Sequence, residues 1–348
     1  MARTRPVDGS TCLVTGSAGF VGSNLVRALL ARGCIVHGFD TALAPFEDPN
    51  LRWFQGDIRN EHDLREALQG VDTVFHTAAL IATVTHAPHA FAGLVRSVNV
   101  EGTRSVVRLA QESGVERLVH TSSIITAFGQ QIAGADETGP YSTATDLYTS
   151  TKVAAERLVL AANGESGLLT CAVRPGGIYG PGERNTFIGP MVKAIKDGFP
   201  VVVFGDGKSL LDYTYIDNLV DAQLRAAERL VEGSPVCGQA YFVTDGDPIN
   251  TGTFSQTLVQ NMGLDTRSIR VPGLVARTLA TASERVFQIF GKPKPPVSIV
   301  EVQLCVAGSH FSIGKAKRDL EYEPLVDTHE GLRRTAKDAR EYYDSLGT

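Results

Sequence analysis

Tyr148 and Lys152 lie four residues apart in the segment YTSTK, at the start of a predicted helix. Residues i and i+4 share one face of a helix, so the phenol and the ammonium are expected to project side by side. A phenol with an ordinary pKa of about 10 is a poor base at neutral pH, but a neighbouring cation favours the phenolate. The pair can then take a proton from an alcohol or return one to a ketone. The same spacing also arises by chance on helix surfaces, so its meaning depends on what surrounds it.

A hydroxyl that orients the substrate oxygen would complete this chemistry. The segment TSS, Thr121 to Ser123, ends a predicted strand upstream of the tyrosine. Ser123 is the first candidate for that hydroxyl, and Ser122 is the alternative.

A glycine-rich turn near the N-terminus predicts a dinucleotide site. The segment TGSAGFVG places Gly16, Gly19 and Gly22 after a predicted strand and at the opening of a helix. Glycines let the backbone turn tightly and approach a pyrophosphate, which then lies at the positive N-terminus of the helix. Three spaced glycines alone are weak evidence, and the strand before and the helix after make the pattern specific.

Acidic and small residues downstream refine this prediction. Asp40 ends the second predicted strand, where a carboxylate can accept hydrogen bonds from ribose hydroxyls and would repel a 2′-phosphate, which favours NAD over NADP. The other interpretation of Asp40 is a turn or cap residue. Asp57 is expected to face the adenine amino group and Ile58 to pack on the ring. In HTAA (76–79), the small residues leave room for the cofactor, and His76 is interpreted as structural.

These residues belong to an alternation of apolar strands and amphipathic helices, which predicts an α/β fold with a doubly wound parallel sheet of the Rossmann type. Six strands are predicted, over 11–16, 34–40, 51–57, 72–79, 117–123 and 168–175. Helices are predicted over 21–33, 62–70, 98–114, 150–164 and about 216–230. After Gly180 the rhythm is interrupted by Pro and Gly segments. We therefore expect a cofactor domain of residues 1–180 plus about 209–245, interleaved with a smaller C-terminal substrate lobe of about 181–208 and 246–348.

Composition restricts the class of protein. The chain has 348 residues, of which 43% are hydrophobic and 20% charged, with a net charge of −5 and no basic block, which argues against nucleic acid as a partner. No signal peptide is recognised, and no apolar run is long enough to span a membrane. Five widely spaced cysteines without CxxC pairs are expected to be reduced thiols, which favours a cytoplasmic location. His86 and His89 in HAPH are interpreted as part of a loop, and no metal site is predicted.

Taken together, TGSAGFVG, Asp40, GDI, HTAA, VNVEGT, TSS, YTSTK and RPGGIYGPG resemble, in this order, the extended short-chain dehydrogenase/reductase superfamily. The resemblance implies a catalytic group of Ser123, Tyr148 and Lys152, with Asn99 supporting the lysine and Arg174 anchoring a strand end. It also implies NAD as the cofactor and, as is common in the superfamily, a homodimer. The cofactor-binding positions that it implies are Gly16, Gly19, Phe20, Val21, Gly22, Asp40, Asp57, Ile58, Thr77, Ala78, Ala79, Asn99, Thr121, Tyr148, Lys152, Pro175, Gly176, Gly177 and Ile178.

The segment GDGKSLLDYTYIDN distinguishes branches of this superfamily. Sugar-nucleotide members usually carry an arginine where this chain has Leu211. A diphosphate is bound by cationic or hydrogen-bond-donating groups, which leucine does not provide. We therefore expect a hydrophobic substrate. LLTCAVRPGGIYGPGERN, YIDNLVDA and HFSIGKAKRDLEYEPL are similar to 3β-hydroxysteroid dehydrogenases, including the bacterial cholesterol-type enzymes. The resemblance implies NAD-dependent oxidation of a 3β-hydroxyl to a ketone, and a Δ5 to Δ4 double-bond shift stays open. The alternatives are a sugar-nucleotide epimerase or dehydratase, a reductase of another lipophilic ketone such as a β-keto acid or flavonoid, and a non-catalytic NAD-sensing protein.

The late segment LVARTLATASERVFQIF has apolar residues at helical spacing and few charges. Two interpretations are open for it. It is either a hydrophobic wall around a flat lipid, with at most peripheral membrane contact, or a helix that faces the core of the smaller lobe.

Overall fold

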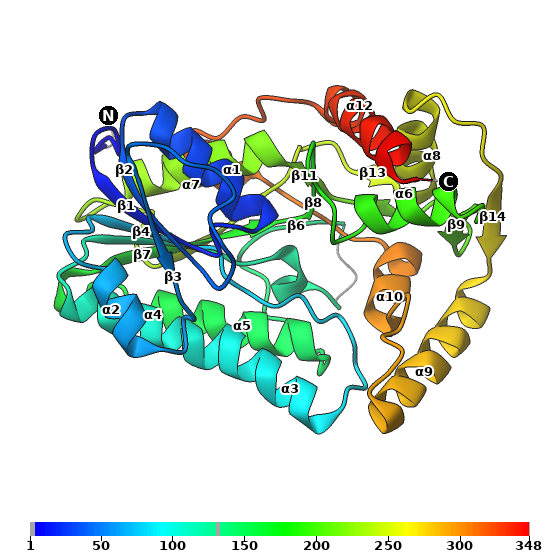
Figure 1. Cartoon of the computed structure of the whole chain (residues 1–348), viewed down its shortest axis with the longest axis horizontal. Coiled ribbons are helices and arrows are strands. Elements are labelled where there is room, and N and C mark those ends of the chain that lie inside the picture. Colours follow the sequence, from blue (N-terminus) through cyan, green and yellow to red (C-terminus); the bar gives the residue numbers. More distant parts are fainter. Residues whose placement is uncertain (1–3, 130–132, 348) are drawn as a thin grey trace.

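The structure is a computed structural model that describes residues 4–129 and 133–347, and a seven-stranded parallel sheet forms its centre (Figure 1). The strands of this sheet are β1 (Thr11–Thr15), β2 (Ile35–Asp40), β3 (Leu51–Gln55), β4 (Thr73–His76), β5 (Arg117–Thr121), β7 (Leu169–Pro175) and β12 (Gln239–Val243). Their spatial order is β12-β7-β5-β4-β1-β2-β3. The order reverses between β1 and β4, which is where a doubly wound sheet opens a crevice for ligands at its carboxyl edge. The predicted Rossmann-type fold and its six strands are confirmed, and β12 is a seventh strand that was not predicted.

Helices cover both faces of the sheet. On one face α1 (Phe20–Ala31) contacts α7 (Ile216–Arg229), and on the other α4 (Thr103–Glu112) contacts α2 (Glu61–Ala67) and α5 (Leu147–Ala161) (Figure 1). Helix α1, for example, buries Leu25, Val26 and Leu29 and leaves Arg27 exposed.

Two local predictions need correction. Residues 98–114 do not form one helix, because a π-helical turn, η1 (Ser97–Gly102), precedes α4. The HAPH segment is a loop only in part, since His89 begins α3 (His89–Arg96), which leads directly into η1. Single π-helical turns inside longer helices are frequent at functional sites, and this one contains Asn99.

The C-terminal half adds a second group of elements beside the sheet (Figure 1). They are α6 (Ile188–Lys196), β9 (Val201–Phe204), α8 (Thr251–Asn261), β14 (Ser268–Val271), α9 (Gly273–Phe290), α10 (Ile299–Ala307) and α12 (Thr328–Ser345). Helix α12 packs on α6 and α8, α10 packs on α9, and β9 pairs in parallel with β14. Helix α11 (Gly314–Leu320) instead packs on α7 and β12.

Short elements connect the two groups. Three two-stranded pairs are β6 (Ala133–Ala135) with β15 (His310–Phe311), β8 (Gly177–Tyr179) with β11 (Tyr213–Tyr215), and β10 (Leu210–Leu211) with β13 (Ile249–Asn250). The 3₁₀ turns are η2 (Ile124–Ala127) and η3 (Glu165–Gly167). The pair of β8 and β11 places the segment after β7 against the chain that enters α7.

All five cysteines are free; Cys12, Cys34 and Cys171 are buried, and the other two are half-buried. Within the described ranges, no helix is both long and apolar enough to cross a bilayer.

Candidate active site

The turn between β1 and α1 is a cradle that only glycine can form. Gly16 has a φ of +74°, and a Cβ there would lie 2.8 Å from Cα of Ala78. A Cβ on Gly22 would collide with the Gly16 carbonyl. The absence of both side chains lets the turn close on itself and exposes the N-terminus of α1, an arrangement that fits a pyrophosphate. Phe20 and Val21 form the first turn of α1 and are half-buried.

Asp40 ties the end of β2 to this turn. One carboxylate oxygen accepts a hydrogen bond from the Ala18 amide (3.0 Å), and the other accepts one from the Ala42 amide (3.0 Å). Asp40 therefore does hold a turn, and its half-buried carboxylate lies beside the glycine cradle, where a ribose would be recognised.

The segment after β3 differs from its prediction in one respect. The side chain of Ile58 is buried, 5% exposed, and packs in the core against Gly102, so it does not present a face for an adenine ring. An apolar side chain gains more from filling that space than from remaining at the surface. Asp57 stays at the edge of the site, where its carboxylate pairs with Arg59 (2.6 Å), and this pairing lowers the pKa of Asp57.

The end of β4 joins the cradle from the other side. Thr77 Oγ1 donates to the Thr15 carbonyl (2.7 Å), and Ala78 lies beside Gly16. The His76 ring is held at both nitrogens, by Thr15 Oγ1 (2.7 Å) and by Thr103 Oγ1 (2.9 Å). Burial lowers the pKa of His76 to about 3, so its imidazole is neutral and structural.

Tyr148 lies in the first turn of α5, which Asp146 caps by accepting a hydrogen bond from the Thr149 amide (2.9 Å). Burial raises the pKa of Tyr148 to about 12, and the charge of Asp146 adds to that rise. A hydrogen bond with Ser123 lowers the pKa in part. Ser123 caps η2 by accepting a hydrogen bond from the Ile125 amide, whereas the buried hydroxyl of Ser122 has no partner within the described residues. The structure therefore brings Ser123 to the phenol.

Lys152 lies one turn further along α5 and is buried. Its Nζ donates to the Thr121 carbonyl at the end of β5 (2.6 Å). Burial lowers the pKa of Lys152 to about 8, and the charge of Glu156 opposes that change. Burial and the charge of Asp146 both raise the pKa of Tyr148, and Ser123 alone opposes them, so the expected acidification of the phenol by Lys152 and a bound nicotinamide stays a prediction.

Asn99 contacts the residue before Lys152 and not Lys152 itself. Its side chain accepts from the Leu80 amide (2.7 Å) and donates to the Leu80 carbonyl (3.0 Å) and to Thr151 Oγ1 (3.1 Å). Asn99 thus joins the loop after β4 to the residue that precedes Lys152.

A buried ion pair that was not predicted holds α5 to β7. Glu156 of α5, 0% exposed, pairs with Arg174 of β7 through two contacts (Nε to Oε2 2.9 Å, Nη2 to Oε1 2.5 Å). The Arg174 guanidinium also lies over the rings of Phe242 (5.1 Å) and Tyr141 (5.3 Å). Arg174 was expected to anchor a strand end, but Glu156 was not predicted as its partner. The available sequence signal was the position of Glu156 on the same helix, four residues after Lys152.

Hydrogen bonds to Asp212 and Thr214 hold the segment after Arg174. The Gly176 amide donates to Thr214 Oγ1 (2.8 Å), and the Gly177 amide donates to the Asp212 carbonyl (3.1 Å). A Cβ on Gly176 would lie 2.5 Å from that carbonyl oxygen. The backbone from Pro175 to Ile178 is therefore fixed at the carboxyl edge of β7.

Apolar side chains from distant segments surround the phenol. Tyr148 packs in a cluster with Ile125 and Phe128 of the η2 region and with Val300 and Leu304 of α10. Leu211, the position that distinguishes branches of the superfamily, is buried. An apolar wall with a few polar groups suits a hydrophobic ligand that carries one reactive oxygen.

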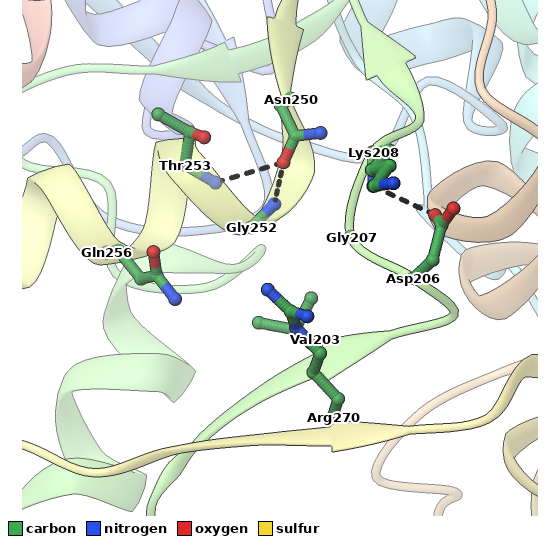
Figure 2. Close-up of a pocket in the computed structure, with 9 residues that line it drawn as sticks. All are labelled: Val203, Asp206, Gly207, Lys208, Asn250, Gly252, Thr253, Gln256 and Arg270. Carbon is green, nitrogen blue, oxygen red and sulfur yellow. Dashed lines mark hydrogen bonds between the residues drawn. The ribbon is translucent and has the colours of Figure 1, made fainter.

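A separate polar hollow of about 270 Å³ lies between β9, β14 and the start of α8. Figure 2 shows Lys208 and Arg270 beside it, with Asn250 capping α8 through the amides of Gly252 and Thr253. The carboxylate of Asp206 also lines the hollow and offsets one of the two cations. Among the described residues, no three His, Cys, Asp or Glu side chains are grouped so that they could hold a metal ion.

The fold and the order of these motifs define an extended short-chain dehydrogenase/reductase of the epimerase/dehydratase type. The family model described as "3-beta hydroxysteroid dehydrogenase/isomerase family" matches residues 13–273. The chain belongs to this family.

Two bacterial relatives are similar over almost the whole chain. The 3-beta-hydroxysteroid dehydrogenase of Mycolicibacterium neoaurum is 40% identical, over 99% of this chain and 95% of its own length. The 3 beta-hydroxysteroid dehydrogenase/Delta 5-->4-isomerase of Mycobacterium tuberculosis (strain ATCC 25618 / H37Rv) is 42% identical, over 96% of this chain and 90% of its own length. Among solved structures, MoeE5 in complex with UDP-glucose and NAD has a TM-score of 0.75 at 26% identity, covering 95% of this chain and 99% of MoeE5.

Proposed function

We propose that this protein is an NAD-dependent dehydrogenase that oxidises the 3β-hydroxyl of a steroid to the 3-ketone. One observation carries the proposal: Tyr148 lies close enough to Ser123 for that serine to lower its pKa, and it packs in an apolar cluster with Val300 and Leu304 of α10. Membership of the 3-beta hydroxysteroid dehydrogenase/isomerase family and the names of the two bacterial relatives support the same substrate class.

The cofactor would be held along the carboxyl edge of the sheet. The glycine cradle from Gly16 to Gly22 would receive the pyrophosphate and the Asp40 carboxylate the ribose hydroxyls. The remaining length of the cofactor would be lined by Thr77 to Ala79, by Thr121 and by the segment from Pro175 to Ile178. The NAD-bound neighbour MoeE5 supports this choice of cofactor.

Each catalytic side chain has a distinct role. Ser123 donates a hydrogen bond that orients the substrate oxygen. The Tyr148 phenolate takes the hydroxyl proton during oxidation, and the phenol returns it to the ketone during reduction. Lys152, fixed at the Thr121 carbonyl, supplies the cation below the phenol and holds the nicotinamide ribose. NAD, when bound, accepts the hydride, and its positive ring favours the phenolate.

A substrate panel tests the proposal. Purified protein is mixed with NAD and 3β-hydroxysteroids, 3α-epimers or UDP-sugars, and NADH is followed by absorbance. We expect turnover of the 3β-hydroxysteroids alone. Turnover of UDP-sugars without sterols would refute the branch. Tight NAD binding without turnover of any alcohol would instead favour an NAD sensor.

Three further features belong to this proposal. The cofactor unit comprises residues 1–180 and about 209–245, and the substrate lobe comprises about 181–208 and 246–348, with α11 packed back on the first unit. The five free cysteines support a cytoplasmic location. The resemblance to the superfamily supports a homodimer, which light scattering after size-exclusion chromatography would test.

A further inference from the structure

Glu284 is a charged residue on the buried side of α9. It is 0% exposed and lies between Ala280 and Phe287 on that side of the helix. Burying a carboxylate is costly unless hydrogen bonds replace the water that it loses. A helix that needed only to pack would gain more from an apolar residue at this position. The carboxylate is therefore explained by the groups that it binds.

The Glu284 carboxylate connects two separate segments through their backbones. Oε2 accepts hydrogen bonds from the amides of Thr85 (2.9 Å) and His86 (2.8 Å). These two residues lie in the segment 77–88 between β4 and α3, which contains neither helix nor strand and which we call the β4–α3 loop. Oε1 accepts a hydrogen bond from the amide of Ile299 (2.8 Å), the first residue of α10. Three backbone donors from two segments thus share one side chain.

Helix α10 connects Glu284 to the phenol from one direction. Val300 directly follows Ile299, whose amide the carboxylate holds. The Val300 side chain packs in the apolar cluster that contains Tyr148. Helices α9 and α10 pack on each other (Figure 1), so the position of α10 depends on the contacts that it makes with α9. A shift of the Ile299 amide would therefore move the apolar wall beside Tyr148.

The β4–α3 loop connects Glu284 to the same phenol from another direction. The Val84 carbonyl, next to the two loop amides that Glu284 binds, accepts a hydrogen bond from the Leu147 amide (3.4 Å). Leu147 also packs with Ala82 of the loop in a buried cluster. Since Leu147 directly precedes Tyr148, the loop bears on the start of the helix that carries the phenol.

We propose that Glu284 is a positioning residue of the sterol site. It fixes α10 and the β4–α3 loop in one arrangement around Tyr148, and the preference of the site for a sterol over a small alcohol depends on that arrangement. The inference rests on the proposed function, because it takes the substrate to be a sterol that is oxidised at Tyr148. The hydrogen bonds of Glu284 go to backbone amides and not to a reacting group, so its loss should affect the binding of a large substrate more than the chemical step.

Glu284→Gln tests the proposal in the full chain. Glutamine has the same length, but one of its two terminal groups is an NH₂, which donates and cannot accept. Whichever way the side chain is turned, either the Ile299 amide or the two loop amides lose their acceptor. With saturating NAD, the KM for a 3β-hydroxysteroid should rise about tenfold, as expected for a buried donor left without its acceptor. The KM for cyclohexanol and the affinity for NAD should stay within about twofold, because neither depends on the apolar wall of α10.

Hydrogen–deuterium exchange measures the same bonds without any substrate. At least one of the peptides that cover residues 80–88 and 297–304 should exchange faster in Glu284→Gln, since its amides lose their acceptor.

Thr83→Val is a milder variant that decides the question if Glu284→Gln does not fold. It removes only the hydrogen bond from Thr83 Oγ1 to Glu301 Oε1 (3.0 Å), which also joins the β4–α3 loop to α10. It should raise the sterol KM about threefold and leave the KM for cyclohexanol unchanged.

Glu183→Gln is the matched control. Glu183 is also a buried carboxylate that accepts hydrogen bonds from backbone amides, but its four bonds stay within residues 185–188. Its substitution should lower the melting temperature, as Glu284→Gln does, without changing the ratio of the two KM values. An equal rise of both KM values in Glu284→Gln, or the same change of their ratio in the control, would show that Glu284 only stabilises the fold and would overturn the proposal.

The two proposals fail in different ways. A protein that oxidises no 3β-hydroxysteroid refutes the proposed function, and with it the sterol site that Glu284 would position. A protein that oxidises sterols, and whose sterol KM is unchanged in both Glu284→Gln and Thr83→Val, refutes the role of Glu284 alone.

Discussion

Replacing Glu156 with glutamine tests whether the buried ion pair stabilises the fold and maintains the pKa of Lys152, the proposed catalytic lysine. Glu156 and Arg174 are both buried, with side chains 0% and 6% exposed, and the pair is held by two contacts. Glu156→Gln keeps the size of the side chain but leaves the Arg174 charge without its carboxylate. Breaking one partner of a buried pair costs about 3–5 kcal/mol. For 348 residues, with an unfolding entropy of roughly 2.1 cal/mol/K per residue, this loss corresponds to a melting temperature about 4–7 °C lower.

The same substitution should change the pH dependence of the reaction. The charge of Glu156 raises the pKa of Lys152, which burial otherwise lowers, so glutamine should bring that pKa below its present value of about 8. Lys152 then loses its proton at lower pH, and the limb of the kcat/KM profile that reports the ammonium should move in the acid direction. His76 and His120, the other titratable groups that interact with Lys152, are neutral because burial lowers the pKa of each.

Differential scanning calorimetry and pH profiles of NADH formation provide the two measurements. Glu101→Gln is the control, because Glu101 forms an exposed ion pair with Arg104, and such pairs contribute about 1 kcal/mol or less. The reasoning is refuted if Glu156→Gln melts within about 1 °C of the unmodified protein, or if its pH profile is unchanged. A double substitution Glu156→Leu/Arg174→Met should recover part of the lost stability, since it removes both charges.

Three more predictions follow from the geometry. Gly22→Ala places a Cβ against the Gly16 carbonyl and should weaken NAD binding at least about tenfold by titration calorimetry, and unchanged affinity would contradict the cradle. Val300→Ala should raise KM for a sterol more than for cyclohexanol, because it removes part of the apolar wall beside Tyr148, and equal effects would place the sterol elsewhere. His76 has a folded pKa of about 3 against an ordinary 6.5, so the unfolded chain binds more protons between these values, and stability should fall as the pH decreases from 6.5 toward 3. Urea unfolding at pH 7 and pH 5 should show a smaller loss in His76→Gln, and equal losses would refute this assignment.

Elements with a strong local signal were predictable from the sequence. The six strands and the glycine turn follow from apolar runs and glycine spacing, both of which are readable within a few residues. Tyr148 and Lys152 share a helix, so their mutual position follows from helical periodicity alone. The capping of α5 by Asp146 is likewise local.

Features that depend on distant contacts were not predictable from the sequence. Val300 reaches Tyr148 only through tertiary packing, and no local pattern relates the two positions. The Ile58 side chain fills the space left by the missing side chain of Gly102. Gly102 belongs to η1, and no local pattern relates the two positions. The raised pKa of Tyr148 in the chain without cofactor was not predictable for a related reason: the sequence shows the lysine nearby but not the burial that raises this pKa.

The account depends most directly on proton transfer at the Tyr148 oxygen. Tyr148→Phe removes that oxygen and keeps the ring in its apolar cluster, so NAD affinity and melting temperature should stay within experimental error. Single-turnover oxidation of a 3β-hydroxysteroid should slow by about 10²–10⁴-fold, and the rise in rate with pH expected of a phenol with a raised pKa should disappear. A phenylalanine variant that retains more than about a tenth of the single-turnover rate, with its pH dependence intact, would contradict the assignment of Tyr148 as the proton-transferring group.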